Sequence, residues 1–341
     1  MRNKIVLNCL VLFVFGAVCI TATAVLAQEK VIQLRYTTVF ASGHENFKIA
    51  NAWCDEVEKR THGKVKVRQY ATGVLTPPAQ IYDSVVQGVV DVGNMVLGYT
   101  MGRFPLTEVL DYPLGYPSGL VATGLANAHY AKFKPKEFDE LKVLYLHAQG
   151  PGILHARKPV NKMEDLKGMK IRTSGSNARF ISQLGGIPVA MPMPEAYDAL
   201  SKGVADGILV GYEGLEGWKL GEVIQYTTEN YDTSYTAVFA VVMNKNKWNS
   251  IPPDAQKIIE QINQEWIEKQ GKVWDAADAS GKAFSLKRGN KVIKLSEEEN
   301  KRWVAKAQPL FEDYVKNTKA KGLPGDEVLR FAQDYLKSNR K

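Results

Sequence analysis

The chain has 341 residues, 45% hydrophobic and 23% charged, with a formal net charge of +8. This length corresponds to about two domains of roughly 150 residues each. The positive charges are interspersed with Asp and Glu, which favours a solvated surface over a general attraction for anions. No block of like charge and no interleaving of aromatic and basic residues suggests nucleic acid as a partner.

The N-terminus has the pattern of a secretory signal peptide. Arg2 and Lys4 precede an uncharged apolar run over residues 5–20, and small residues follow up to Ala27. We predict a signal peptide over residues 1–27, with Ala24 as the second choice of cleavage site. An uncleaved anchor is the alternative, but the run is short for a span of about 20 apolar residues. Export to the periplasm is therefore expected.

The cysteines and histidines predict neither a disulfide nor a metal centre. Cys9 and Cys19 lie in the predicted signal peptide, so Cys54 would remain alone in the mature chain. The five histidines show no metal-ligand spacing, and neither a Gly-x-Gly-x-x-Gly nor a phosphate loop follows a strand. We expect no metal and no cofactor.

The first part of the mature chain alternates between strand and helix patterns. Apolar and β-branched residues predict strands over 31–40 and 65–70. Helical spacing predicts a helix that ends at His62, and a second one that continues to Val89. Strand, helix, strand and helix in this order predict a largely parallel α/β sheet.

Two segments of the chain resemble each other. Residues 87–99 contain Gly88 and Asp91 between a predicted helix and strand, and residues 202–212 repeat the arrangement with Gly203 and Asp206. The glycine supplies a left-handed helix end and the aspartate a turn. Chance similarity of a common connection is one explanation. Two similar α/β lobes with a cleft between them is the other, and it fits the chain length.

The remaining elements predict how the chain divides between lobes. Strands are expected over 141–148, 168–173 and 237–243, a crossover at 149–152, and long helices from residue 252 to the C-terminus. We therefore predict an α/β fold with mixed, mostly parallel sheets joined by a hinge. Lobe 1 would comprise residues 28–150 and 237–275, and lobe 2 residues 151–236 and 276–341.

Arg172 is the leading candidate for ligand binding. It ends a predicted strand, and the small and capping residues after it, beginning with Thr173 and Ser174, predict a helix N-terminus. Ligands of open α/β sheets bind beyond the carboxyl ends of strands, and a helix N-terminus offers free N–H groups to an anion. A guanidinium group also matches a carboxylate in two parallel hydrogen bonds. An ordinary surface arginine is the alternative.

The segment around Arg172 resembles a known family. The residues that carry the similarity are Lys158, Pro159, Val160, Glu164, Asp165, Leu166, Lys167, Gly168, Met169, Lys170, Ile171, Arg172, Leu184, Gly185, Gly186, Pro188, Val189, Glu195, Tyr197, Ala199, Leu200, Gly203, Asp206 and Gly207. Together they resemble the signature of substrate-binding subunits of tripartite ATP-independent periplasmic (TRAP) transporters, the DctP family. The similarity extends over nearly the whole mature chain.

The resemblance carries expectations for fold, function and partners. It implies a type II-like periplasmic binding protein with two lobes that close over a small carboxylate, and it implies that Arg172 forms the salt bridge to that carboxylate. It also implies delivery to membrane permease subunits driven by an ion gradient rather than by ATP. We expect a monomer or weak dimer.

Departures from the family pattern predict an apolar pocket. Polar members often have a second arginine where this chain has Gly152, Ile153 and Leu154, and many have asparagine near Val210 and Gly211. Other pocket positions, matched by spacing, are apolar or aromatic: Val39, Pro78, Val96, Tyr99 and Met193. One anion anchor with apolar walls favours a monocarboxylate with a hydrophobic or aromatic body. A C4-dicarboxylate or sugar acid is the alternative, although it would leave polar groups unpaired.

Two loops supply further candidates for ligand contact. Tyr212, Glu213 and Trp218 follow the second repeated segment in a glycine-rich loop, where they would either stack on a flat ligand or pack in a hinge. Phe40 and His44 occupy the corresponding loop of the first lobe, and His44 is expected to initiate a helix or contact the ligand rather than act as a general base.

An exported hydrolase or lyase is the main alternative class. The chain has no His-Glu-x-x-His, no Gly-x-Ser-x-Gly and no Cys-x-x-Cys. We therefore predict a binding protein and not an enzyme. A sensor domain of the same fold would have the same sequence features.

Overall fold

The computed structural model describes residues 31–340, so the predicted signal peptide over residues 1–27 lies outside it. The chain from Ile32 onward is one compact unit. Within residues 31–340, no helix is both long enough and apolar enough to span a membrane. The fold is a mixed α/β structure, as the order of predicted elements indicated.

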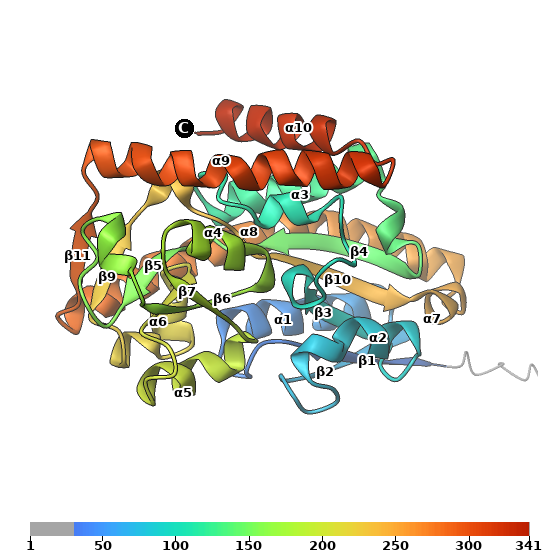
Figure 1. The fold of residues 1–341 in the computed structure, drawn as a ribbon. Helices are drawn as coiled ribbons and strands as arrows, with labels where there is room; N and C mark the ends of the chain where they lie inside the picture. The colour runs from blue at the N-terminus through green and yellow to red at the C-terminus, as the bar shows by residue number, and fades with distance from the viewer. Residues whose placement is uncertain (1–30, 341) are drawn as a thin grey trace, which may run out of the picture. The chain divides into compact units, whose positions relative to one another are not determined.

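The first sheet has five strands in the order β2-β1-β3-β10-β4 (Figure 1). They are β1 (Ile32–Thr38), β2 (Val65–Tyr70), β3 (Val92–Val96), β4 (Leu141–Ala148) and β10 (Val238–Asn244). β1 pairs in parallel with β2 and β3. β10 returns from much later in the chain and pairs antiparallel between β3 and β4.

The second sheet has six strands in the order β11-β9-β5-β8-β6-β7. They are β5 (Ile153–Ala156), β6 (Lys170–Thr173), β7 (Ile187–Ala190), β8 (Gly207–Val210), β9 (Tyr226–Glu229) and β11 (Lys291–Lys294). β6 is parallel to β7 and β8, and β11 is parallel to β9, whereas β5 is antiparallel to both its neighbours. We propose that the two sheets are the cores of two lobes divided at the predicted boundaries.

Ten α-helices surround the sheets in the described residues. They are α1 (Glu45–Arg60), α2 (Ile81–Val86), α3 (Gly119–Phe133), α4 (Ala178–Gln183), α5 (Ala196–Ser201), α6 (Glu213–Gly217), α7 (Lys245–Asn249), α8 (Pro253–Lys287), α9 (Glu297–Ala320) and α10 (Gly325–Ser338). α8 packs against α1, α3 and β4 of the first sheet, and against α6 beside the second. α9 packs against α4, and α10 returns to α3 (Figure 1).

The repeated sequence segments form equivalent structural units. Asp91 accepts a hydrogen bond from the backbone N–H of Arg35 over 2.7 Å and donates its own N–H to the Arg35 carbonyl over 3.0 Å. Asp206 makes the same two bonds with Lys170, over 2.9 and 2.7 Å. In each case the aspartate ties the start of one strand to the parallel strand beside it.

Helix ends differ slightly from the sequence predictions. The helix expected to reach Val89 ends at Val86, because Gly88 takes a positive φ of 73° and turns the chain toward β3. Gly203 has the same φ of 73° after α5. The C-terminal helical region is broken as expected, since β11 separates the 35-residue α8 from α9 and a turn separates α9 from α10.

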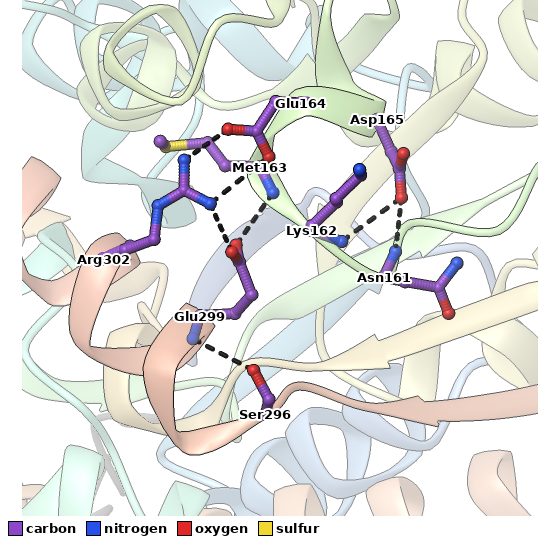
Figure 2. Close-up of polar contacts among 8 residues, drawn as sticks. All are labelled: Asn161, Lys162, Met163, Glu164, Asp165, Ser296, Glu299 and Arg302. Atoms are coloured by element: carbon purple, nitrogen blue, oxygen red, sulfur yellow. Dashed lines mark hydrogen bonds and ion pairs between the residues drawn. The ribbon is translucent and has the colours of Figure 1, made fainter.

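Polar contacts fasten α9 to the second sheet (Figure 2). Ser296 caps the helix by accepting the N–H of Glu299 over 3.2 Å, and Glu299 accepts the N–H of Met163 over 2.9 Å. Arg302 forms ion pairs with both Glu164 and Glu299. The hydrogen bond from Arg302 lowers the pKa of Glu164 to about 2. The C-terminal helices are thereby anchored to the connection that precedes β6.

Candidate ligand-binding site

A cavity lies between the two sheets, where the space free of protein atoms, including space open to solvent, is about 410 Å³. Its lining comes from both halves of the fold: Val39, Phe40, Val96, Tyr99, Gln149, Arg172, Ser174, Met193, Val210, Glu213, Trp218, Tyr235, Ala237, Phe239 and Trp274. Carboxyl ends of strands from both sheets meet here, as in other open α/β folds.

Arg172 is the one cationic side chain among these lining residues. It projects from β6 and is 3% exposed. Its Nε and Nη2 both donate to the carbonyl of Met191, over 3.1 and 2.7 Å. The remaining nitrogen, Nη1, makes no hydrogen bond to the described residues. The bonds from Nε and Nη2 therefore fix the orientation of the guanidinium group, and Nη1 remains free to donate hydrogen bonds to a ligand.

Two further polar groups beside Arg172 have unused hydrogen-bonding capacity. Nε2 of Gln149 and Oγ of Ser174 are buried, belong to residues that line the cavity and have no hydrogen-bond partner among the described residues. Buried polar groups are nearly always satisfied in folded proteins, so an unsatisfied pair in a cavity indicates a place for a ligand or water. An amide, a hydroxyl and a guanidinium all donate hydrogen bonds, which is the requirement for binding a carboxylate.

Aromatic rings form much of the remaining wall. The ring of Phe40 lies 5.4 Å from that of Phe239, 5.8 Å from Trp274 and 6.3 Å from Trp218, measured between centroids. Tyr235 also lines the cavity. Such a wall offers an apolar, flat surface to the body of a ligand.

The segment after Arg172 begins a helix, as expected, but its first turn is tight. Residues Gly175–Asn177 form a 3₁₀ turn and α4 has only six residues. The side chain of Asn177 donates to the carbonyl of Asp111 over 2.8 Å. This turn therefore also connects the second sheet to the segment before α3.

Tyr235 explains why the chain has glycine at position 152. A Cβ atom built on Gly152 would lie 2.1 Å from Cε1 of the Tyr235 ring, so no larger residue fits while the ring is in place. The hydroxyl of Tyr235 donates to the Leu209 carbonyl over 2.9 Å, which holds the ring there. An aromatic ring therefore occupies the region where polar family members were expected to carry a second arginine.

His44 and Glu213 meet across the two halves of the fold. Nδ1 of His44 accepts the N–H of Asn46 over 3.1 Å and so caps α1. Because Nδ1 is an acceptor, the ring proton is on Nε2, which donates to Oε2 of Glu213 over 3.0 Å. The side chains are 2% and 3% exposed. His44 thus initiates a helix and holds a buried carboxylate in the cavity wall.

The structure brings ten of the predicted site residues to the cavity: Arg172, Val39, Phe40, Val96, Tyr99, Ser174, Met193, Val210, Glu213 and Trp218. Three others lie elsewhere. His44 is behind Glu213, and Pro78 is half-buried in the 3₁₀ turn Pro78–Gln80. Tyr212 is buried and turned toward Glu229, to which its hydroxyl donates over 3.1 Å.

Five lining residues had not been singled out from the sequence: Gln149, Tyr235, Ala237, Phe239 and Trp274. Gln149 and Ala237 lie at the two connections between the sheets, and the expected crossover at 149–152 was a usable signal for the first. Trp274 lies midway along α8 and looks like an ordinary buried helix residue in the sequence.

Residues 36–317 match the model of the family described as bacterial extracellular solute-binding protein, family 7, DctP. The chain belongs to this family. Among the residues that the structure describes, no cluster of His, Cys, Asp and Glu could hold a metal ion. The family comprises transport receptors rather than enzymes.

Solved structures of TRAP solute-binding proteins have the same fold. One from Desulfovibrio salexigens is 34% identical, with a TM-score of 0.81 over 91% of this chain and 97% of that one. Another, from Rhodoferax ferrireducens, contains copurified benzoate and is 30% identical, with a TM-score of 0.85 over 90% of this chain and 98% of that one.

Curated relatives carry more varied names. The outer membrane transporter protein TsaT of Comamonas testosteroni is 27% identical over 86% of this chain and 88% of its own length. More distant relatives, each 25% identical, are a C4-dicarboxylate-binding protein of Rhodobacter capsulatus and a 2,3-diketo-L-gulonate-binding protein of Escherichia coli. The relatives are thus named for more than one class of acid.

Proposed function

We propose that this TRAP solute-binding protein is a periplasmic receptor for a monocarboxylate with a hydrophobic or aromatic body. The observation that carries the proposal is the composition of the cavity: one cation, Arg172, with two unpaired polar groups beside it and a largely aromatic wall elsewhere. The benzoate in the related Rhodoferax structure supports this ligand class. The ligand carboxylate would bind Arg172, Ser174 and Gln149.

A C4-dicarboxylate or sugar acid is the second candidate, and two features of the cavity disfavour it. A second carboxylate would need a second cation, and the lining contains none besides Arg172. Glu213 would repel it, because like charges in a buried site are unfavourable. A polyhydroxy ligand would lose its hydrogen bonds to water, and the aromatic rings of the wall would not replace them.

The transport cycle follows from the way the two sheets contribute to the cavity. The ligand would bind while the proposed lobes are apart, and closure would bury it. The closed surface would then be recognised by permease subunits in the membrane. Because α8 and the connections at 149–152 and 230–237 join the two sheets, we propose that they form the hinge.

The test is calorimetric titration of the purified receptor with benzoate, phenylacetate, cinnamate and branched aliphatic monocarboxylates, compared with succinate and glucuronate. We expect at least one monocarboxylate to bind at least tenfold more tightly than either of the other two. Tighter binding of succinate or glucuronate than of every monocarboxylate would contradict the proposal. Mass spectrometry of ligand retained by the purified protein provides an independent answer, since a receptor returns its ligand unchanged.

A further inference from the structure

Two opposite charges line the cavity without pairing to each other. Arg172 and Glu213 are each 3% exposed, and no ion pair within 4 Å joins them. Opposite charges attract strongly in a site of low dielectric. Since they do not pair, each is held by other contacts.

Those contacts are visible for both groups. The Met191 carbonyl accepts two hydrogen bonds from Arg172. The neutral His44 ring donates from Nε2 to Oε2 of Glu213, while its Nδ1 accepts the N–H of Asn46 and caps α1. A flip of the ring would break this cap, so the orientation of the ring is fixed. His44 therefore uses one of the two carboxylate oxygens of Glu213.

The other oxygen, Oε1, has no hydrogen-bond partner among the described residues. A carboxylate oxygen is an acceptor only, and an ionised one forms stronger hydrogen bonds than a neutral group. Glu213 lines the cavity together with the aromatic rings of Phe40 and Trp218, and neither ring donates a hydrogen bond to it. One acceptor of a cavity-lining carboxylate thus remains available to a ligand.

We propose that Oε1 of Glu213 accepts a hydrogen bond from a hydroxyl group on the ligand, remote from the carboxylate that Arg172 binds. The inference rests on the proposed function and narrows it to hydroxylated aromatic monocarboxylates. A hydroxyl group brings one donor for one free acceptor. An ammonium group brings three donors, of which two would lack partners in this wall.

The recognition would be selective against ligands without the hydroxyl. A site built to bond a hydroxyl group discriminates strongly against analogues that lack it, because its own polar group is then buried without a partner. His44 acts as a positioning residue, since it orients Glu213 without lining the cavity. Because His44 precedes α1 and Glu213 begins α6, this orientation depends on the two halves being together.

The experiment compares matched ligand pairs on matched variants. Benzoate is titrated beside the three monohydroxybenzoates, and phenylacetate beside the hydroxyphenylacetates, on the wild type, Glu213→Gln and Glu216→Gln. Glu216 is an exposed carboxylate on the same helix and serves as the control. We expect at least one hydroxylated acid to bind the wild type tenfold or more tightly than its parent acid.

In Glu213→Gln this ratio should fall at least fivefold, and Glu216→Gln should match the wild type. An unchanged ratio in Glu213→Gln, while the parent acids still bind, overturns the hydroxyl assignment and leaves the proposed function intact. Failure of every aromatic acid to bind the wild type overturns the hydroxyl assignment, and failure of the branched aliphatic monocarboxylates as well overturns the proposed function itself. Tighter binding of 3-(aminomethyl)benzoate than of any hydroxylated acid also overturns the assignment, in favour of an ammonium ligand.

Discussion

The backbone N–H of Met193 donates a hydrogen bond to the hydroxyl oxygen of Tyr99 over 2.8 Å. Tyr99 follows β3 of the first sheet, and Met193 follows β7 of the second. Both residues line the cavity. The bond therefore joins the two halves of the fold at the wall of the ligand site, and it is available only when they are together.

Replacing Tyr99 by Phe should weaken ligand binding by about three- to tenfold, because one hydrogen bond of about 1 kcal/mol would be lost from the closed arrangement. Calorimetric titration measures the change. Tyr197→Phe is the control, since this half-buried tyrosine bonds to Glu222 away from the cavity. Equal affinities of Tyr99→Phe and the wild type would show that the bond does not contribute to closure.

Replacing Arg172 by Gln should reduce the affinity for a carboxylate ligand by about 2 to 5 kcal/mol, since one partner of a buried charge pair is removed. The variant should still fold, as the unliganded arginine makes hydrogen bonds only to Met191. Arg179→Gln is the matched control, because that exposed arginine pairs with Asp313. If Arg172→Gln binds carboxylates as the wild type does, the anchor lies elsewhere.

Asp278 should make stability depend on pH. It accepts the N–H of Glu213 over 2.8 Å from its place on α8, and burial raises its pKa to about 8. Its pKa in the unfolded chain is about 3.9. The folded state holds the proton more tightly, so the contribution of Asp278 to stability is fully present below about pH 4 and is lost as the pH rises through about 8.

Asp278→Asn removes this dependence and keeps an acceptor for the Glu213 N–H. Its stability relative to the wild type should therefore increase between pH 5 and pH 8, by at most about 1.4 kcal/mol per pH unit. Urea unfolding at four pH values in this interval measures the difference. Asp139→Asn, an exposed site, is the control. Parallel curves for Asp278→Asn and the wild type would refute the prediction.

Gly152→Ala should destabilise the protein by about 1 to 3 kcal/mol, because the new methyl group would overlap the Tyr235 ring. Ligand affinity should also fall, since that ring lines the cavity. Gly43→Ala is the control, as a Cβ there meets no atom within 4 Å. Thermal unfolding and calorimetry of both variants give the comparison, and a Gly152→Ala protein as stable as the wild type would contradict the packing argument.

Local sequence patterns predicted much of the fold because their causes are local. The strands over 65–70 and 141–148 have the predicted bounds, since apolar, β-branched residues and flanking turn signals mark both. Gly88 and Gly203 marked helix ends because only glycine adopts positive φ without strain. The position of Arg172 at the end of a strand followed from the same reasoning.

Tertiary structure alone decided how the cavity is completed. Phe239 and Trp274 reach it from β10 and α8. The spacing of residues in the sequence does not predict which distant segments meet there. His44 and Glu213 are 169 positions apart, and their hydrogen bond fixes which carboxylate oxygen stays free. The sequence by itself determined the family, many of the elements and the candidate anchor Arg172 through short-range patterns. The shape of the site and the orientation of Glu213 within it arise from long-range packing, which exists only once the chain has folded.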